Sequence, residues 1–329
     1  MTGFDRILLA DIGGTNARFA LLNQGEIGPI SRIKVAEQRG FIEAVTAFLT
    51  PHRAGGAIGA AVLGVAGTVE ENRCRVTNSG WMVDGGVLQA AFGFKPVRLL
   101  NDFEALAWSL PRLKPADLYP NGGGRSVAGA PMLVIGPGTG FGAACLVSPD
   151  GSAVAIAAEC GHATLPGTSQ RDDAVIDHLR SQFGHVSAER ALSGPGLENL
   201  YTAFAAIDRV DVPHRDATAI TQAALDGSCG VCRAALDMFC AMLGTVAGNL
   251  ALTFCARGGV FIAGGIVPRF VDDVARSKFR ERFEAKGRFR PYLQGIPTNI
   301  ILRPDATFIG LQAFFERQCG VSGKSDRLG

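Results

Sequence analysis

Near its N-terminus the chain places an acid and two glycines between two apolar runs. The segment Leu8–Leu22 reads LLADIGGTNARFALL. Glycine allows positive φ and close approach of other groups to the backbone, so such a turn can direct several N–H groups at a phosphate. An ordinary hairpin is the alternative. Asp11 either orients a Mg²⁺ ion and its waters or caps the turn through its own backbone. The turn residues are Gly13, Gly14, Thr15 and Asn16.

A similar segment occurs in the second half of the chain. Setting Thr15 on Thr139 aligns GTNARFALL with GTGFGAACLV, so each half has an apolar strand, a glycine-rich turn and a second apolar strand. We interpret the match as an internal duplication. Two such turns facing each other would hold the phosphate tail of a nucleotide. The second turn consists of Gly138, Thr139 and Gly140.

A third glycine pair, Gly264 and Gly265, follows the expected strand Val260–Ala263. A helix is expected to begin near Pro268, because proline suits the first helical turn. Small residues at the carboxyl end of a strand let a flat ligand such as adenosine lie against the backbone. Close packing of the strand against the helix explains the pair equally well.

Polar residues that suit a sugar follow other predicted elements. Asn101 and Asp102 come directly after an apolar strand and start a helix. Asp102 is either the helix N-cap or a general base that accepts a proton from a substrate hydroxyl. Glu159 and His162, in ECGH, and Glu189 suit a polyhydroxylated ligand if they converge on one pocket. As isolated residues they fit surface or capping roles. Glu159 and His162 have no nearby third ligand, which argues against a metal site.

Two other nucleotide motifs are incomplete. GTGFGA, from Gly138, fits the loose dinucleotide fingerprint, but a strand follows it where that motif needs a helix. This argues against NAD. GKS at Gly323–Ser325 resembles the end of a P-loop, but Gln318 stands where the first glycine is required.

Composition excludes several other classes of function. Lys and Arg total 32 against 30 Asp and Glu in 329 residues, without a run of like charges, so nucleic acid is not an expected partner. The first apolar run is too short for a signal peptide. The most apolar stretch, 243–256, is interrupted by Gly248 and Asn249 and is shorter than the roughly 20 residues that span a bilayer. We expect a cytoplasmic protein without a membrane partner.

The eight cysteines are scattered, which fits reduced thiols better than a disulfide framework. Cys229 and Cys232 form one CxxC. Because no second pair or well-spaced histidine follows, zinc is weakly supported. The simpler interpretation is two thiols near the start of a helix.

Strands and helices alternate at short spacing, which indicates an α/β protein. The loop-rich segment 111–131 suggests a crossing between domains, and the half that follows is more helical than the first. Expected helices cover 41–49, 87–92, 172–183, 197–206, 217–225, 231–254 and 308–317. Expected strands cover 7–10, 17–22, 30–35, 57–65, 97–100, 132–135, 143–147, 260–263 and 300–303.

Taken in order, six motifs resemble those of bacterial ATP-dependent glucokinases, in the actin, Hsp70 and sugar kinase superfamily. They extend over nearly the whole chain and are DIGGTNARFAL, NDFEALA, GPGTGFG, ECGH, HVSAERALSGPGLENLY and GGVFIAGGIVPRF. The resemblance implies a two-domain actin-like (ribonuclease H-like) fold with an interdomain cleft. It implies a small domain of residues 1–110 plus 303–329, a large domain of 111–302, and a homodimer.

The resemblance also implies residue roles in transfer of the γ-phosphoryl group of ATP to the 6-hydroxyl of glucose. Asp102 would be the general base and Asp11 would organise Mg²⁺. The phosphates would contact Gly13–Asn16 and Gly138–Gly140, and the adenosine would contact Gly264 and Gly265. The expected sugar ligands are Asn101, Asp102, Glu159, His162 and Glu189.

The chain departs from the family pattern at two places. Glu-Cys-Gly-His replaces the usual Glu-Gly-Gly-His, and NSGW at Asn78–Trp81 replaces Asn-His-x-Trp. Cys160 either alters the sugar fit slightly or makes the site sensitive to oxidation. The alternatives to a glucokinase are a kinase for another hexose or an N-acetyl amino sugar, and a non-catalytic sugar sensor. A repressor of that last kind needs a DNA-binding module, for which the segments flanking the motifs offer little room.

Overall fold

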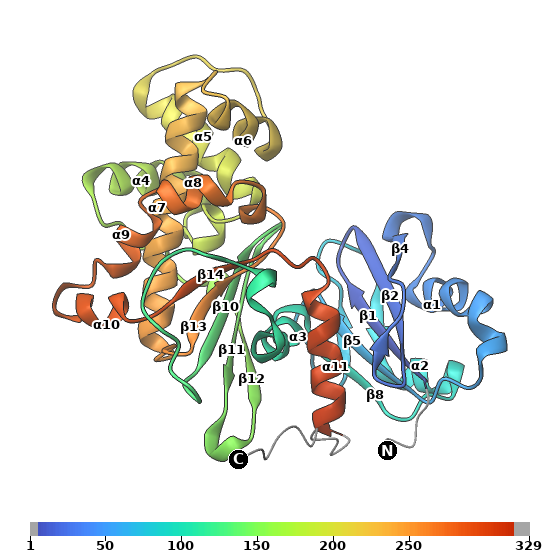
Figure 1. Ribbon diagram of the computed structural model, residues 1–329. Helices are drawn as coiled ribbons and strands as arrows, with labels where there is room; N and C mark the ends of the chain where they lie inside the picture. Colours follow the sequence, from blue (N-terminus) through green and yellow to red (C-terminus); the bar gives the residue numbers. More distant parts are fainter. Residues whose placement is uncertain (1–5, 319–329) are drawn as a thin grey trace. The chain divides into compact units, whose positions relative to one another are not determined.

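The computed structural model describes residues 6–318, and the Gly323–Ser325 tripeptide lies outside them. The chain divides into two compact units. Unit 1 contains the residues up to Leu113 together with those from Pro304 onward, and unit 2 is Lys114–Arg303. Each unit is built around its own β-sheet with helices beside it (Figure 1).

The sheet of unit 1 begins with a hairpin of β1 (Arg6–Ile12) and β2 (Asn16–Asn23). β5 (Ala60–Val65) pairs in parallel with β1, and β8 (Val97–Asn101) pairs in parallel with β5. β5 is buried along its whole length, which explains its unbroken apolar sequence. The short strands β3 (Glu26–Ile27) and β4 (Ser31–Lys34) pair with β2.

Alternate residues of the unit 1 strands pack against different helices. Leu8, Ala10 and Ile12 belong to a core that also contains residues of α1 (Phe41–Leu49) and α2 (Gly85–Phe92). This core includes the hairpin of β6 (Arg73–Arg75) and β7 (Met82–Asp84). The other helices, α3 (Asp102–Ser109) and α11 (Ala306–Gln318), pack closely against each other and against β5.

A glycine sets the distance between α3 and α11. A Cβ atom at Gly310 would lie 1.7 Å from the carbonyl oxygen of Ala105, so only glycine lets α11 approach α3 this closely. Gly64 of β5 plays a similar part beneath α3, where a Cβ would lie 3.2 Å from that of Ala105. These contacts fix α3, the helix that begins with Asp102, on its sheet (Figure 1).

The sheet of unit 2 repeats the topology of unit 1. β10 (Met132–Pro137) and β11 (Phe141–Val147) form a hairpin, and β13 (Gly259–Ile262) pairs in parallel with β10. β14 (Thr298–Ile301) pairs in parallel with β13, as β8 does with β5. The predicted repeat of strand, glycine turn and strand is therefore confirmed. β12 (Val154–Ala158) and β9 (Leu118–Pro120) occupy the edges.

The helices of unit 2 surround α7 (Gly230–Thr253). This helix is long and apolar enough to span a membrane, so the expectation that no stretch reaches that length is wrong. Its most apolar window is 78% buried inside the protein, which identifies α7 as a core helix. The helices packed against it are α5 (Gly194–Asp208), α6 (Ala217–Leu225), α9 (Phe279–Glu284) and α10 (Arg290–Gln294), and α4 (Gln170–Phe183) packs against α5.

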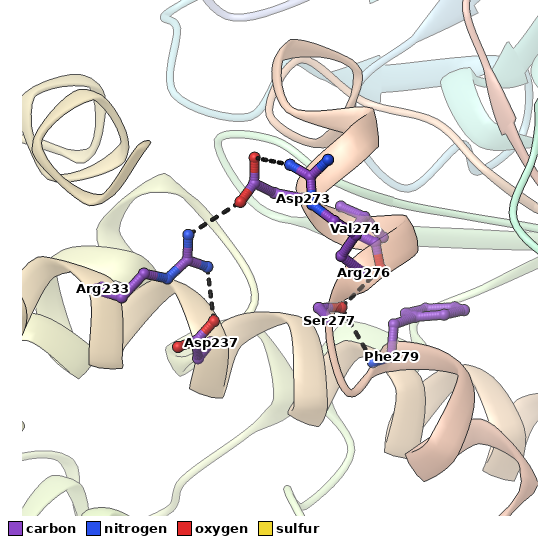
Figure 2. A network of polar contacts seen from close by, with 7 residues as sticks. All are labelled: Arg233, Asp237, Asp273, Val274, Arg276, Ser277 and Phe279. Carbon is purple, nitrogen blue, oxygen red and sulfur yellow. Dashed lines mark hydrogen bonds and ion pairs between the residues drawn. The ribbon is translucent and has the colours of Figure 1, made fainter. Parts of the chain in front are cut away.

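The segment after Gly264 and Gly265 differs from its prediction. A single 3₁₀ turn, Val267–Arg269, occupies the place of the expected helix start, and α8 (Val271–Arg276) begins later. Figure 2 shows how α8 is attached to α7. Arg233 of α7 donates to Asp273 of α8 at 3.0 Å and to Asp237 at 2.6 Å. The segment that follows the glycine pair is therefore held on the central helix.

Candidate active site

The glycine turn between β1 and β2 is tight and packed. The Gly13 N–H donates to the carbonyl oxygen of Asn16 at 3.0 Å, which closes the turn. A Cβ at Gly14 would lie 2.6 Å from the carbonyl oxygen of Thr77, so a side chain is excluded there. Thr15 is exposed at the tip. The turn thus leaves backbone and a hydroxyl accessible, as a phosphate site requires.

The carboxylate of Asp11 forms an ion pair with Arg18, its cross-strand neighbour on β2. The same guanidinium donates to the carbonyl oxygen of Pro304 at 2.7 Å and lies over the ring of Phe308. Arg18 therefore connects Asp11 to the start of α11. Sequence reasoning missed Arg18, although a single cation inside an apolar strand was a usable signal.

The end of β8 forms the N-terminus of α3. The Oδ1 atom of Asn101 accepts from the N–H groups of Phe103 at 2.9 Å and Glu104 at 3.2 Å. Asn101 is therefore the N-cap, and the interpretation of Asp102 as the cap is wrong. Asp102 is instead the first residue of the helix, where its Oδ1 atom accepts from the Phe103 N–H at 3.0 Å.

Three loops of unit 1 meet beside Asn101. The Nδ2 atom of Asn101 donates to the carbonyl oxygen of Gly67 at 3.1 Å. A Cβ at Gly67 would lie 3.3 Å from the hydroxyl of Thr77, the residue that also packs against Gly14. Thr77 thus connects the glycine turn with the start of α3. The sequence signal for this loop was the NSGW segment, in which Asn78 adopts a φ of 59°.

Strand register places Asp11 and Asn101 at the same end of the sheet. Ile12 pairs with Val65, and Val65 pairs with Asn101, at the carboxyl ends of three parallel strands. Ligands of open α/β sheets bind at the carboxyl ends of the strands. The structure therefore brings the glycine turn, Asn101 and Asp102 together within unit 1.

The glycine turn of unit 2 is bound to the N-terminus of α5. The Gly138 N–H donates to Gly140 at 2.8 Å, and the Gly194 N–H donates to the Gly138 carbonyl oxygen at 2.8 Å. Ser193 caps the helix by accepting from the Gly196 N–H at 2.9 Å. The partial positive charge at a helix N-terminus favours anions, so this turn also suits phosphate.

Glu189 contacts the same turn. Its Oε2 atom accepts from the Phe141 N–H at 2.9 Å, and a Cβ at Gly140 would lie 2.5 Å from that oxygen. The hydroxyl of Ser193 donates to the Glu189 carbonyl oxygen at 2.8 Å. The carboxylate is thus fixed between the glycine turn and the cap of α5, because Gly140 leaves it room.

Glu159 and His162 belong to a neighbouring 3₁₀ segment. Their Oε2 and Nε2 atoms lie 3.9 Å apart, and both side chains are about two-thirds exposed (65% and 66%). Between them, Gly161 packs on Phe141, where a Cβ would lie 2.2 Å from the carbonyl oxygen. The segment with Glu159 and His162 also contacts the one with Glu189. The three predicted sugar residues of unit 2 therefore lie around Phe141.

Cys160 is partly buried against the core of unit 2. Burial raises the pKa of its thiol, and the charge of Glu159 adds to this effect, although a backbone hydrogen bond opposes it. A raised pKa lowers the thiolate fraction and with it the reactivity toward oxidants. The surroundings of Cys160 therefore do not favour the expected sensitivity to oxidation.

The two glycines after β13 have different surroundings. Gly264 has a φ of 90°, and a Cβ there would lie 2.2 Å from the carbonyl oxygen of Pro137 at the end of β10. Gly265 is exposed, and a Cβ there would meet nothing within 4 Å. Close packing thus explains Gly264, while Gly265 leaves open space beside the glycine turn of the same unit.

A family model described as Glucokinase matches residues 8–318. The chain belongs to the glucokinase family. It is 46% identical over 308 residues to a glucokinase of Paramagnetospirillum magneticum, covering 93% of this chain and 96% of that protein. The family resemblance inferred from the six motifs is thereby confirmed.

Solved structures agree with this assignment. The glucokinase of an Antarctic psychrotroph is 37% identical and superposes with a TM-score of 0.86, covering 94% of this chain and 98% of that one. A ROK family glucokinase of Streptomyces griseus, 20% identical, gives a TM-score of 0.66 and covers 95% of this chain and 99% of its own. This second likeness shows the fold. The predicted α/β, actin-like sugar kinase fold is confirmed.

Proposed function

We propose that the chain transfers the γ-phosphoryl group of MgATP to the 6-hydroxyl of glucose, with Asp102 as general base. ATP-dependent phosphorylation of glucose is the activity of the glucokinase family, to which the chain belongs. The Streptomyces griseus relative is described in complex with glucose and AMPPNP, which supports the same two substrates. The observation that supports Asp102 is its position at the first residue of α3, beside a cap supplied by Asn101.

Asp102 suits the role of base because another residue caps its helix. The carboxylate accepts the proton of the 6-hydroxyl as that oxygen attacks the γ-phosphorus atom. Phosphoryl transfer depends mainly on positioning and on stabilisation of charge. The cap formed by Asn101, and the packing of Gly310 on α3, hold the carboxylate in place.

The remaining sugar contacts are assigned by chemistry. Asn101, Glu159, His162 and Glu189 bind the other hydroxyls of glucose, since carboxylates accept from hydroxyls and an amide or imidazole N–H donates to their oxygens. Glu159, His162 and Glu189 lie around Phe141 of unit 2. Asn101 and Asp102 belong to unit 1. We assign the units as the two domains of the kinase.

The glycine turns bind the phosphates of ATP through backbone N–H groups, assisted by Thr15 and Thr139. Gly265 leaves room for the adenosine. Mg²⁺, which neutralises phosphate charge when bound, fits Asp11. That ion is usually held by one or two carboxylates together with phosphates and water. Among the described residues, no group of three or more His, Cys, Asp or Glu side chains is placed to hold a metal ion.

Steady-state rates on a panel of sugars test the proposal. We expect the highest kcat/KM with glucose, lower values with mannose and N-acetylglucosamine, and a preference for ATP over polyphosphate. A higher kcat/KM for another sugar would overturn the assignment of glucose. Absence of phosphorylation of every sugar, with sugar binding intact by calorimetry, would favour the non-catalytic sensor.

We also propose a homodimer and a cytoplasmic location, both on the family resemblance. Sedimentation equilibrium at micromolar concentration is expected to give twice the chain mass of 34.4 kDa. A mass equal to that of one chain over the whole concentration range would contradict the dimer.

Gly140→Ala is expected to weaken glucose binding. Its methyl group would overlap the Oε2 atom of Glu189 and displace the carboxylate from the Phe141 N–H. A hydrogen bond to a charged group contributes about 1.5–3 kcal/mol, so the Kd for glucose should rise roughly ten- to hundredfold. Isothermal titration calorimetry with glucose measures this change.

Gly138→Ala is the matched control in the same turn. A Cβ at Gly138 meets nothing within 4 Å, so Glu189 keeps its position. We expect this variant to raise the KM for ATP and to leave the Kd for glucose within twofold. Equal effects of both variants on glucose binding would contradict the role of Glu189.

A further inference from the structure

Cys229 and Cys232 lie together at the N-terminus of α7, the 24-residue central helix of unit 2. Cys229 is the N-cap residue, and its Sγ atom accepts from the Cys232 N–H at 3.4 Å. This bond turns the first sulfur toward the second residue. Cys229 is half-buried and Cys232 is fully buried. One thiol is therefore accessible to a reagent, and the other is not.

The surroundings make the two thiols chemically different. Burial acts to raise the pKa of Cys229, but hydrogen bonds from the Cys232 thiol and N–H outweigh it, and the pKa lies below its usual value. The charge of Arg215 contributes in the same direction, and the Nε atom of that residue is buried without a hydrogen-bond partner. Burial raises the pKa of Cys232 to about 12. Cys229 is thus the better nucleophile.

The first turns of α7 are held firmly. Arg233, the residue after Cys232, bonds to Asp237 of the same helix and to Asp273 of α8 (Figure 2). Cys232 also packs in the core of the unit. The buried thiol therefore has a fixed position, while Cys229 lies at the end of the helix, where rotation of a capping side chain is possible.

A metal site does not explain the pair. Within residues 6–318 no group of three or more His, Cys, Asp or Glu side chains is placed to hold a metal ion. Structural zinc needs four ligands. The two thiols are instead spaced at i and i+3, and the first has a lowered pKa at a helix N-terminus. Proteins that carry out thiol–disulfide exchange use this arrangement.

We propose that Cys229 and Cys232 form a reversible disulfide by exchange with a low-molecular-weight disulfide of the glutathione class. The Cys229 thiolate attacks one sulfur of the small disulfide, which gives a mixed disulfide and one small thiolate. Cys232 then loses its proton and attacks the Cys229 sulfur, which releases the second small thiolate. The two protein thiols are oxidised, the small disulfide is reduced, and both protons pass to the released thiolates. This proposal is independent of the kinase activity.

Peptide mass spectrometry of the intact enzyme, incubated with glutathione disulfide and then digested, tests the proposal. A Cys255→Ser background removes the competing thiol that is exposed among residues 6–318. We expect the peptide with both cysteines to lose two hydrogen atoms and to regain them after treatment with dithiothreitol. Retention of both thiols in this peptide after incubation with glutathione disulfide would overturn the proposal.

Two single variants identify the order of attack. Cys232→Ser should stop at one glutathione adduct on Cys229, because no second thiol is present to displace it. Cys229→Ser should give no adduct on the buried Cys232. Rapid modification of Cys232 in that second variant would contradict the assignment of Cys229 as the attacking thiol. If either single variant fails to fold, the mass-spectrometric result for the protein with both cysteines decides whether the disulfide forms.

Discussion

Asp102→Asn is expected to lower kcat by about 10²–10⁴-fold, the usual contribution of a general base. The amide cannot accept the proton of the sugar hydroxyl, but it keeps the shape and can still form hydrogen bonds with glucose. The fold should persist, because Asn101 and not Asp102 caps α3. Rapid-quench or coupled assays measure kcat, and calorimetry should give a Kd for glucose within a few-fold of the unchanged enzyme.

Glu104→Gln provides the matched control. Glu104 is an acid in the same first turn of α3, and burial raises the pKa of its carboxyl group. Its replacement removes a carboxylate from the same helix N-terminus without removing the proposed base. We expect kcat to stay within about threefold of that of the unchanged enzyme. This loss is much smaller than the one expected when a general base is removed. Near-normal turnover of Asp102→Asn, or an equal loss in both variants, would refute the assignment.

Asp11→Ala is expected to impair turnover that depends on Mg²⁺ far more than sugar binding. A carboxylate that orients metal-bound water acts as an outer partner of the ion, and loss of such partners typically costs about 10–100-fold in metal affinity or activity. The Mg²⁺ concentration for half-maximal rate should therefore rise by about that factor at fixed ATP. The Kd for glucose, measured without nucleotide, should change little.

The Asp11→Asn variant distinguishes a role of the Asp11 charge toward Mg²⁺ from a role of its contact with Arg18. The asparagine Oδ1 atom can still accept from the guanidinium, so the link from β1 to Pro304 through Arg18 should survive. If Asp11 serves the metal, both variants lose Mg²⁺-dependent rate alike. A normal Mg²⁺ titration in Asp11→Asn, with a low Tm in Asp11→Ala, would show that Asp11 acts only through Arg18.

Local sequence patterns predicted the long elements well. The boundaries of α1 and α6 agree with their predictions, because amphipathic spacing is a local signal. The edge strands β3, β9 and β12 and the short helices α9 and α10 were not predicted, and α8 begins later than the helix expected near Pro268. Such elements have few residues and owe their conformation to partners distant in the sequence, so local patterns indicate them poorly.

The ambiguity between Asn101 and Asp102 shows how far the sequence alone could predict the candidate site. Both residue types are good N-caps, so propensity could not choose between them. The choice depends on where β8 ends, since the last strand residue, Asn101, has extended backbone and its side chain turns back to the helix. The pairing of β8 with β5 fixes that point, and with it the residue that caps α3.

By itself, the sequence determined the family, the repeated hairpin and the identity of the groups that can do chemistry. These follow from residue type and order, which do not depend on distant contacts. Only the tertiary structure decided that Arg18 pairs with Asp11 and that Glu189 lies on Phe141. Strand register and helix packing set these contacts, because they bring together residues that are separated in the sequence, and local patterns do not contain that information.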